Sequence, residues 1–326
     1  MAEPYRLLLT DRQGTVRDIT ELVSSLTWSG NARQMPRELR GTLAVPRDGS
    51  VDPPALEEGS ILTLQHSGQA LYTGPLTSVT TESQSIVVDF DSMDRAFYLE
   101  QNEGWYQFNG NTPEEIVRAI CQDYGIPVGS LAAAGTAIRR KFPGVNLGDI
   151  MTTAYTMAGA ENGKRYILRF SGSGALEVRE KPTAAGYEIR VTQSVATSWS
   201  IESLQNSVAI YSNTGDLLGR VSDEDSVAIN GLLEHAISQQ NGTDAQAEAQ
   251  AYLTDHETAQ KLTVEVPGDK RLITGEAVIL RDTGMGVSGL FWIDSDTHTW
   301  KNGQHFTKLT LNFRNLMNET SAGGEL

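Results

Sequence analysis

The sequence predicts a mainly β protein in which two similar β-barrels flank a small α/β domain. Three observations predict this class: short extended runs at both ends of the chain, a helix-rich stretch between them, and an internal repeat. The expected boundaries are 1–103 for the first barrel, 104–190 for the α/β domain and 191–326 for the second barrel. A length of 326 residues suits two or three domains of ordinary size.

The first segment, residues 1–103, has the pattern of an all-β domain. Extended runs such as "YRLLLT", "SILTLQH" and "SIVVDFDSM" are separated by Gly, Pro, Asp and Ser turns. We therefore expect short strands and no helix in this segment.

The middle segment, residues 104–190, introduces helical periodicity. In "NTPEEIVRAICQDYG", Thr112 is the expected N-cap, Pro113 the first helical residue and Gly125 the end. A second helix is expected over "NLGDIMTTAYTMAGAEN", and "RYILRF" and "ALEVRE" should form a hairpin around "SGSG". Cys121 falls within the first helical pattern, which favours an inert core thiol over a nucleophile or a redox sensor. The apolar face of that helix is expected to contain Ile116, Ala119, Ile120 and Tyr124.

The last segment, residues 191–326, returns to strands, interrupted by a helix in "DAQAEAQAYLTDHETAQ". Within it, "GMGVSG" has the G-x-G-x-x-G spacing of a dinucleotide-binding loop, which requires a helix directly after the glycines. The strand-like run "LFWIDSDTHTW" follows instead, so the sequence predicts a hairpin tip. Asn302–Gly303 predicts a second, tight turn.

An internal repeat relates residues 59–90 to residues 275–313. Each segment begins with a glycine and an apolar strand, continues through a glycine hairpin tip, and then has an aromatic-bearing strand. The final strands end in "VDF" and "LNF". We interpret the repeat as two barrels of one architecture, although β-meanders in general share some of these features.

Charge divides unevenly along the chain. The net charge is −15, and residues 1–100, 101–195 and 196–326 carry −6, +1 and −10. Such a surface repels nucleic acid and anionic membranes. A single cysteine, no signal-peptide pattern and no apolar run near the ~18 residues of a membrane helix predict a protein made and assembled inside the cell.

No catalytic, cofactor-binding or metal-ligating residue can be named from the sequence, so no enzyme, cofactor or metal is predicted. The five histidines lack HExxH or similar spacing. His298 and His305 flank the Asn302–Gly303 turn, and we expect a cross-strand surface pair rather than a metal site. The acidic run 223–225 lacks the order of a calcium loop and is expected to be a solvated turn.

Four stretches carry a family resemblance: "LTWSGNARQMPRELRGTLAV", "FDSMDRAFYLEQNEGWYQFNGNTPEEIVRAICQDYGIPVG", "DSVAINGLLEHAISQQNG" and "GLFWIDSDTHTWKNGQHFTKLTLNF". With them the chain resembles the late-control D family of tail hub proteins, in particular the hubs of PBSX-like defective prophages and related contractile tails. The likeness covers nearly the whole chain and includes Arg37 and Arg40 before a strand. Asn230 stands before Gly231 where the family usually has an aromatic residue.

This resemblance implies a structural role: a homotrimeric baseplate hub that adapts a sixfold tail tube to a threefold central spike. Two tube domains in each of three chains would offer six equivalent surfaces. The implied partners are the spike, a tail tube or tube-initiator protein and the tape-measure protein, with DNA passing an acidic lumen without binding, and no membrane. The implied location is a virion or phage-tail-like particle, assembled in the bacterial cytoplasm.

Alternatives remain open at this point. The middle domain resembles a LysM-like peptidoglycan-binding module in outline, so a peptidoglycan-binding protein or a tail-associated cell-wall hydrolase is the main rival. A glycosidase would need two carboxylates about 5–10 Å apart. The chain has 41 acidic residues, and the sequence does not indicate which two of them would form such a pair. A surface adhesin is a further rival, against which the missing export signal counts. A DNA-carrying phage and a headless bacteriocin fit the sequence equally well.

Overall fold

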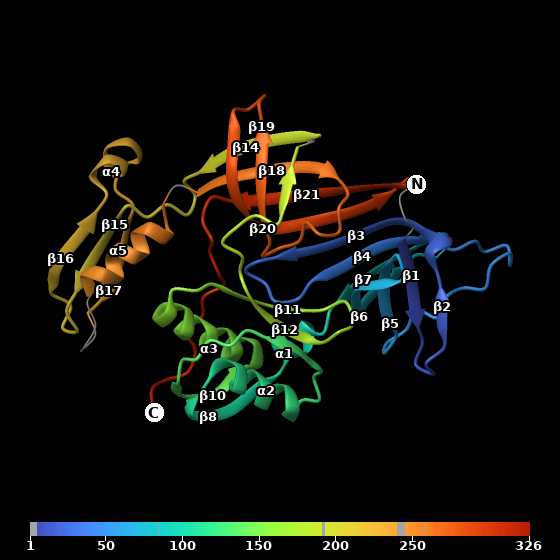
Figure 1. The fold of residues 1–326 in the computed structure, drawn as a ribbon, viewed down its shortest axis with the longest axis horizontal. Helices are drawn as coiled ribbons and strands as arrows, with labels where there is room; N and C mark the ends of the chain where they lie inside the picture. The colour runs from blue at the N-terminus through green and yellow to red at the C-terminus, as the bar shows by residue number, and fades with distance from the viewer. Residues whose placement is uncertain (1–4, 84, 191–192, 240–244, 258) are drawn as a thin grey trace. The chain divides into compact units, whose positions relative to one another are not determined.

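The computed structural model describes residues 5–83, 85–190, 193–239, 245–257 and 259–326 (Figure 1). These residues form mostly strands, which confirms the predicted mainly β class. The chain divides into two compact units, one made of residues 1–195 and 263–326 and the other of residues 196–262. None of the described helices is long and apolar enough to cross a bilayer.

The first repeat is an antiparallel sheet with the strand order β3-β4-β7-β6-β5-β1-β2. Its strands are β1 (Tyr5–Thr10), β2 (Val16–Asp18), β3 (Val23–Asn31), β4 (Glu38–Ala44), β5 (Ile61–His66), β6 (Gln69–Thr81) and β7 (Val87–Met93), with a 3₁₀ turn at Thr20–Leu22. Alternate residues of these strands point into one apolar core, which contains Leu7, Leu39, Leu62 and Leu64.

The second repeat follows the order β14-β18-β21-β20-β19-β13. Its strands are β13 (Tyr187–Ile189), β14 (Ser194–Ser200), β18 (Ala259–Pro267), β19 (Ala277–Asp282), β20 (Val287–Lys301) and β21 (Gln304–Asn312). Taken in chain order, β13, β14 and β18–β21 therefore occupy the places of β1 and β3–β7. One difference is that β13 runs parallel to β19, whereas β1 runs antiparallel to β5.

The long middle strand of each repeat bends at an irregularity in the same place. In β6, residues up to Pro75 pair with β5, and the register with β7 shifts between Leu76 and Ser78. In β20, residues up to Trp292 pair with β19, and the register with β21 shifts between Ile293 and Ser295. A bulge bends a strand and increases its twist. Each of these two strands can therefore pair with different neighbours along its two halves.

The predicted turns of the second repeat are confirmed. Residues of "GMGVSG" form the tip between the antiparallel strands β19 and β20, with Gly286 at φ +68°. Asn302 and Gly303 both have positive φ and join β20 to β21 as a tight two-residue turn.

A helical segment separates the two repeats. Its elements are α1 (Ala96–Gln101), β8 (Glu103–Asn111), α2 (Pro113–Asp123), β9 (Val128–Leu131), β10 (Ile138–Asn146), α3 (Leu147–Asn162), β11 (Tyr166–Phe170) and β12 (Leu176–Glu180). The strands form a β8–β10 ribbon and a β11-β12-β9 sheet, so the predicted hairpin of β11 and β12 is confirmed. Helix α1 lies within the segment that was expected to contain only strands.

The two predicted helices of this segment begin where their capping residues indicate. Thr112 precedes α2, and its backbone N–H donates to the Glu115 carboxylate at 3.0 Å. Asn146 caps α3 by accepting from the N–H groups of two residues in its first turn. Cys121 is fully buried, and burial raises the pKa of its thiol to about 12, which fits the predicted inert role. Tyr124, expected on the apolar face, is instead 40% exposed.

The second unit contains more than the helix that the sequence predicted. It includes a β16-β15-β17 sheet and two helices, with α5 packed on β15. Its elements are β15 (Ser207–Tyr211), β16 (Leu217–Ser222), α4 (Glu224–Asn230), β17 (Glu234–Ser238) and α5 (Ala245–Asp255). Of the family stretch "DSVAINGLLEHAISQQNG", residues 240–242 lie outside the described residues.

Most of the acidity of the C-terminal third belongs to this second unit. Residues 196–262 contain 10 acidic and 2 basic residues, a net charge of −8. Residues 263–326 contain 8 acidic and 6 basic residues, a net of −2. The charge that the sequence analysis assigned to a second barrel is therefore concentrated between β14 and β18.

Candidate functional site

The two repeats join through β3 and β20, which are adjacent in the sheet although more than 250 residues separate them (Figure 1). Residues 25–31 of β3 pair antiparallel with residues 295–301 of β20. Both strands are largely buried along this ladder: Leu26 and Trp28 on β3, and His298 and Trp300 on β20, are at most 5% exposed. We call this ladder and the side chains on it the junction.

A buried ion pair connects the two sides of the junction. The guanidinium of Arg37 donates to Asp296 through Nη1–Oδ1 at 2.9 Å and Nη2–Oδ2 at 2.5 Å. The Thr274 N–H and hydroxyl also donate to Oδ1, each at 2.7 Å. Burial raises the pKa of Asp296, but the charge and hydrogen bonds of its partners outweigh burial and hold it below its ordinary value. Asp296 is therefore an ionised carboxylate inside the protein.

Glycine and tryptophan shape the space that Arg37 occupies. A Cβ atom at Gly30 would lie 2.1 Å from Arg37 Nη1, so a larger residue there would displace the guanidinium. The Arg37 guanidinium carbon lies 4.1 Å from the centre of the Trp28 ring, a cation–π contact. The ion pair thus depends on β3 as well as on β20.

Two histidines continue the junction toward the β20–β21 turn. His298 Nδ1 lies 3.2 Å from His305 Nε2 and 3.1 Å from the Thr307 hydroxyl. His298 Nε2 lies 3.3 Å from Asp296 but makes no hydrogen bond. Burial lowers the pKa of His305 to about 4, with a smaller contribution from His298. The expected cross-strand contact is present, but His298 is fully buried, so the expectation of a surface pair was wrong.

The corresponding strands at the other end of each repeat are exposed. Residues 77–81 of β6, which match the junction half of β20, are all solvent-exposed. Within the described part of the chain, β14 ends the sheet with β18 as its neighbour, and most of its residues are exposed. Trp28–Ser29–Gly30 on β3 is matched by Trp199–Ser200–Ile201 at β14. Trp28 is 3% exposed, whereas Trp199 is 73% exposed.

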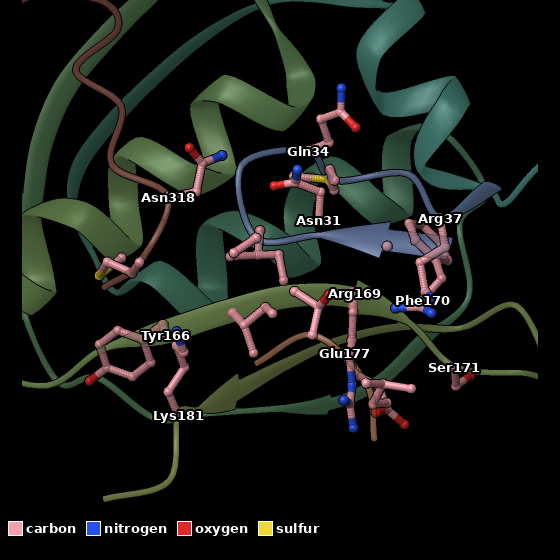
Figure 2. A pocket seen from close by; sticks show the side chains of 18 of the residues that line it. Asn31, Gln34, Arg37, Tyr166, Arg169, Phe170, Ser171, Glu177, Lys181 and Asn318 are labelled. Carbon is pink, nitrogen blue, oxygen red and sulfur yellow. The ribbon is translucent and has the colours of Figure 1, made fainter. Parts of the chain in front are cut away.

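A cavity of about 270 Å³ lies beside the junction (Figure 2). The end of β3, with Asn31, and the loop that follows, with Gln34, lie on one side of it, and β11, with Tyr166 and Arg169, lies on the other. Asn318 comes from the C-terminal segment.

The cations of this cavity are largely paired. Arg37 binds Asp296, Arg169 Nη1 lies 3.3 Å from the Glu276 carboxylate, and Lys181 Nζ donates to the Leu316 carbonyl at 2.5 Å. No group of three His, Cys, Asp or Glu side chains that could hold a metal ion occurs among the described residues.

Sequence reasoning missed the centre of the junction. Arg37 was noted only as part of the family resemblance, with no partner predicted for it. Asp296 was not distinguished from the other acidic residues, of which the chain has 41 in total. The available signal was alternation along β20, where Asp296, His298 and Trp300 fall on one face of a strand.

Comparisons with known proteins agree with this fold. The model of the YQBQ-like family matches residues 26–312. The phage-like element PBSX protein XkdQ of Bacillus subtilis is 24% identical over 313 residues, covering 92% of this chain and 95% of its own.

Two solved structures share the fold. The 43 kDa tail protein of prophage MuSo2 from Shewanella oneidensis aligns with a TM-score of 0.68 at 14% identity, covering 94% of this chain and 98% of its own. The E. coli c3393 protein, a type VI secretion component described as similar to the T4 tail proteins gp27 and gp5, aligns with a TM-score of 0.56 at 10% identity. That alignment covers 93% of this chain and 76% of c3393.

Proposed function

Because the chain belongs to the YQBQ-like family, we propose that it is a structural subunit of a phage tail or phage-tail-like particle rather than an enzyme. Two observations support this role: the relative from the PBSX phage-like element, and the fold shared with a prophage tail protein over nearly the whole chain. On this proposal its location is the baseplate region of the particle, and its assembly takes place in the bacterial cytoplasm.

The finer proposal is a homotrimeric hub, and the observation that carries it is the contrast between the junction and the exposed strands. Within one chain, β3 covers the outer half of β20. The equivalent half of β6 has β7 on one side and, within the described residues, no strand on the other. The equivalent of β3 is β14, an edge strand. Each chain therefore has one satisfied and one unsatisfied copy of the same contact.

We propose that β14 of one copy pairs with β6 of the next, as β3 pairs with β20 within the chain. The contact is head-to-tail, so it must either close into a ring or continue as a filament. Three chains would place six similar repeats around an axis, which matches a sixfold tube. On this proposal the two repeats are the tube domains that the sequence bounded at 1–103 and 191–326. We assign β13 (Tyr187–Ile189) to the second of them, because it pairs with β19, and α1 (Ala96–Gln101) to the separate domain predicted over 104–190.

The proposed partners follow from that symmetry. A sixfold tail tube or tube-initiator protein would stack on the ring, a threefold central spike would sit below it, and the tape-measure protein would meet it inside. The described likeness of c3393 to gp27 and gp5 supports a spike-associated role. We propose that DNA passes the ring without binding, because a wall of net negative charge removes the counterion-release gain that drives binding.

Mass measurement of the protein, alone and with its tube and spike partners, tests the trimer. We expect complexes that contain three copies, and a ring in negative-stain electron microscopy. A complex with one, two or four copies would contradict the proposal. Trp199→Glu should abolish the ring while leaving the monomer folded, because Trp199 is exposed. Trp105→Glu is the matched control, since Trp105 is 81% exposed outside the proposed contact.

The rival role as a cell-wall hydrolase has a simple test. Purified protein incubated with cell walls should leave their turbidity unchanged if the role is structural. A loss of turbidity that persists in the purified chain would favour the enzymatic reading.

A further inference from the structure

The outer face of the β8–β10 ribbon has an unusual composition. The two strands pair antiparallel, and alternate residues such as Phe108 and Phe142 are buried in the core of the helical segment. The residues between them are exposed and form the ribbon face, which we define as Trp105, Gln107, Asn109, Arg139 and Lys141.

Trp105 is the most exposed large apolar side chain in the described part of the protein, at 81%. A Cβ atom at Gly144 would lie 3.4 Å from the indole nitrogen, so the glycine lets the indole lie close to the β10 backbone. An exposed indole offers a flat apolar surface together with one N–H donor.

The polar members of the ribbon face have no partners. In the register of the ribbon, Lys141 lies opposite Gln107 and Arg139 opposite Asn109. Across the described residues, none of these four side chains makes a hydrogen bond or an ion pair. Arg140 differs: its side chain faces the C-terminal segment and donates to the Ala322 carbonyl at 2.5 Å. Glu103, at one end of β8, is the only acidic residue within the two strands, and Glu325 follows Gly324, whose backbone pairs with that of Lys141. The ribbon face itself contains two cations and no acid.

Two unpaired cations side by side are notable in a chain of net charge −15. Charge complementarity points to an anionic ligand. The amides of Gln107 and Asn109 can each donate and accept, which suits hydroxyl and acetamido groups. The apolar face of a sugar ring suits a flat indole.

We propose that the ribbon face binds an anionic glycan, a chain of sugars that carries carboxylate or phosphate groups. Trp105 stacks on a sugar ring, the two amides bind its hydroxyl or acetamido groups, and Arg139 and Lys141 bind the anionic group. This site lies outside the junction and outside β6 and β14, so it does not depend on the proposed hub function.

A glycan suits the ribbon face better than single-stranded nucleic acid does. Surfaces for nucleic acid combine several aromatic side chains with a groove of many cations, because every nucleotide carries a charge. The ribbon face has one aromatic residue and two cations, and the chain as a whole repels a densely charged polyanion. A glycan with one anionic group per disaccharide has a much lower charge density.

Calorimetric titration of the full chain tests the proposal with three probes. They are an octasaccharide of alternating N-acetylglucosamine and glucuronate, neutral chitohexaose, and a 12-nucleotide single strand of DNA. We expect the charged octasaccharide to bind most tightly. Trp105→Ala should weaken its binding about tenfold or more, with Trp105→Phe retaining part of the affinity. Ile229→Ala, at a side chain 80% exposed in the second unit, is the control and should leave binding unchanged.

The charge variants separate the contributions. Arg139→Glu with Lys141→Glu should abolish binding of the octasaccharide and change that of chitohexaose less than about threefold. An added phosphate-bearing glycan, such as a teichoic acid, distinguishes phosphate from carboxylate as the preferred anion. Failure of every glycan to bind, tighter binding of the DNA strand, or unchanged affinity in Trp105→Ala would each overturn the proposal. Because Trp105 is exposed, an unaltered melting temperature should accompany the loss of binding.

Discussion

β20 and β6 hold the same place in their repeats, but their outer halves have opposite surroundings. Asp296, His298 and Trp300 are buried on the half of β20 that pairs with β3, whereas residues 77–81 of β6 are exposed. The types of side chain on the two strands differ in the same way as their burial. The covered strand carries a carboxylate, a histidine and a tryptophan that depend on one another, and the uncovered strand carries Thr77, Ser78, Val79, Thr80 and Thr81.

The difference shows how a repeated sheet can use one contact in two ways. Inside the chain the contact is permanent, so it can include a buried ion pair, which is stable only when both partners are always present. A contact that forms between copies must leave each copy folded when it is absent. Small polar and β-branched residues satisfy that requirement because water can solvate them.

The largest expected effect comes from breaking the junction ion pair. Asp296→Asn should lower the free energy of unfolding by about 3–5 kcal/mol, because it leaves the buried Arg37 guanidinium without a counter-charge. Urea denaturation followed by circular dichroism measures the change. Asp91→Asn removes one of the two carboxylate partners of the exposed Arg40 and should cost less than about 1 kcal/mol. Equal losses in the two variants would refute the contrast between covered and uncovered strands.

The two equivalent tryptophans provide the next test. Trp28→Ala should destabilise the chain by about 3–5 kcal/mol, since it removes a buried ring that packs on Arg37 and His298. Trp199→Ala should change stability by no more than about 0.5 kcal/mol at concentrations where single copies prevail. Melting temperatures of both variants on dilute protein check the difference. A large loss in Trp199→Ala would mean that β14 is already covered within one chain.

His305 should make the free energy of unfolding depend on pH. Its pKa of about 4 in the folded chain lies below the value of about 6.5 in unfolded chains. Between these values the unfolded state binds more protons, so the contribution of His305 to stability is complete above about pH 6.5 and is lost as the pH falls toward 4. His305→Gln should remove about 1–3 kcal/mol of that dependence, measured as the difference between unfolding free energies at pH 7 and pH 4.5. Parallel profiles for the two proteins would exclude this assignment.

The smallest effect concerns the turns at the two ends of β20. Gly303 has φ +72°, a backbone conformation that costs a residue with a side chain about 1 kcal/mol, so Gly303→Ala should destabilise by about that amount. Gly284 lies in the other turn and lacks a positive φ, so Gly284→Ala should be close to neutral. Differential scanning calorimetry can resolve the two. A neutral Gly303→Ala would show that the tight turn does not fix the register of β20.

Local features of this fold were predictable from the sequence, because they depend on residues close together in the chain. Thr112 and Pro113 marked the start of one helix, and Asn302–Gly303 marked a turn. The junction was not predictable, because no local pattern states that Arg37 meets Asp296, 259 residues later in the chain. Only α5 of the second unit was predicted, and it was predicted from its composition, because this helix has little amphipathic character. The three strands of this unit are short, and the sequence did not predict that they form a separate sheet.

The second unit also has a consequence for how such a chain can evolve. The first repeat joins β3 to β4 with the short loop 32–37, whereas the second repeat inserts a whole unit between β14 and β18. Since the chain leaves and returns through neighbouring strands, the insertion leaves the order of the sheet intact. Two copies of a fold encoded in a single gene can therefore diverge separately. In this chain the first repeat has a six-residue loop where the second has a unit of net charge −8, so an insertion at this position can differ in size and charge while the sheet is kept.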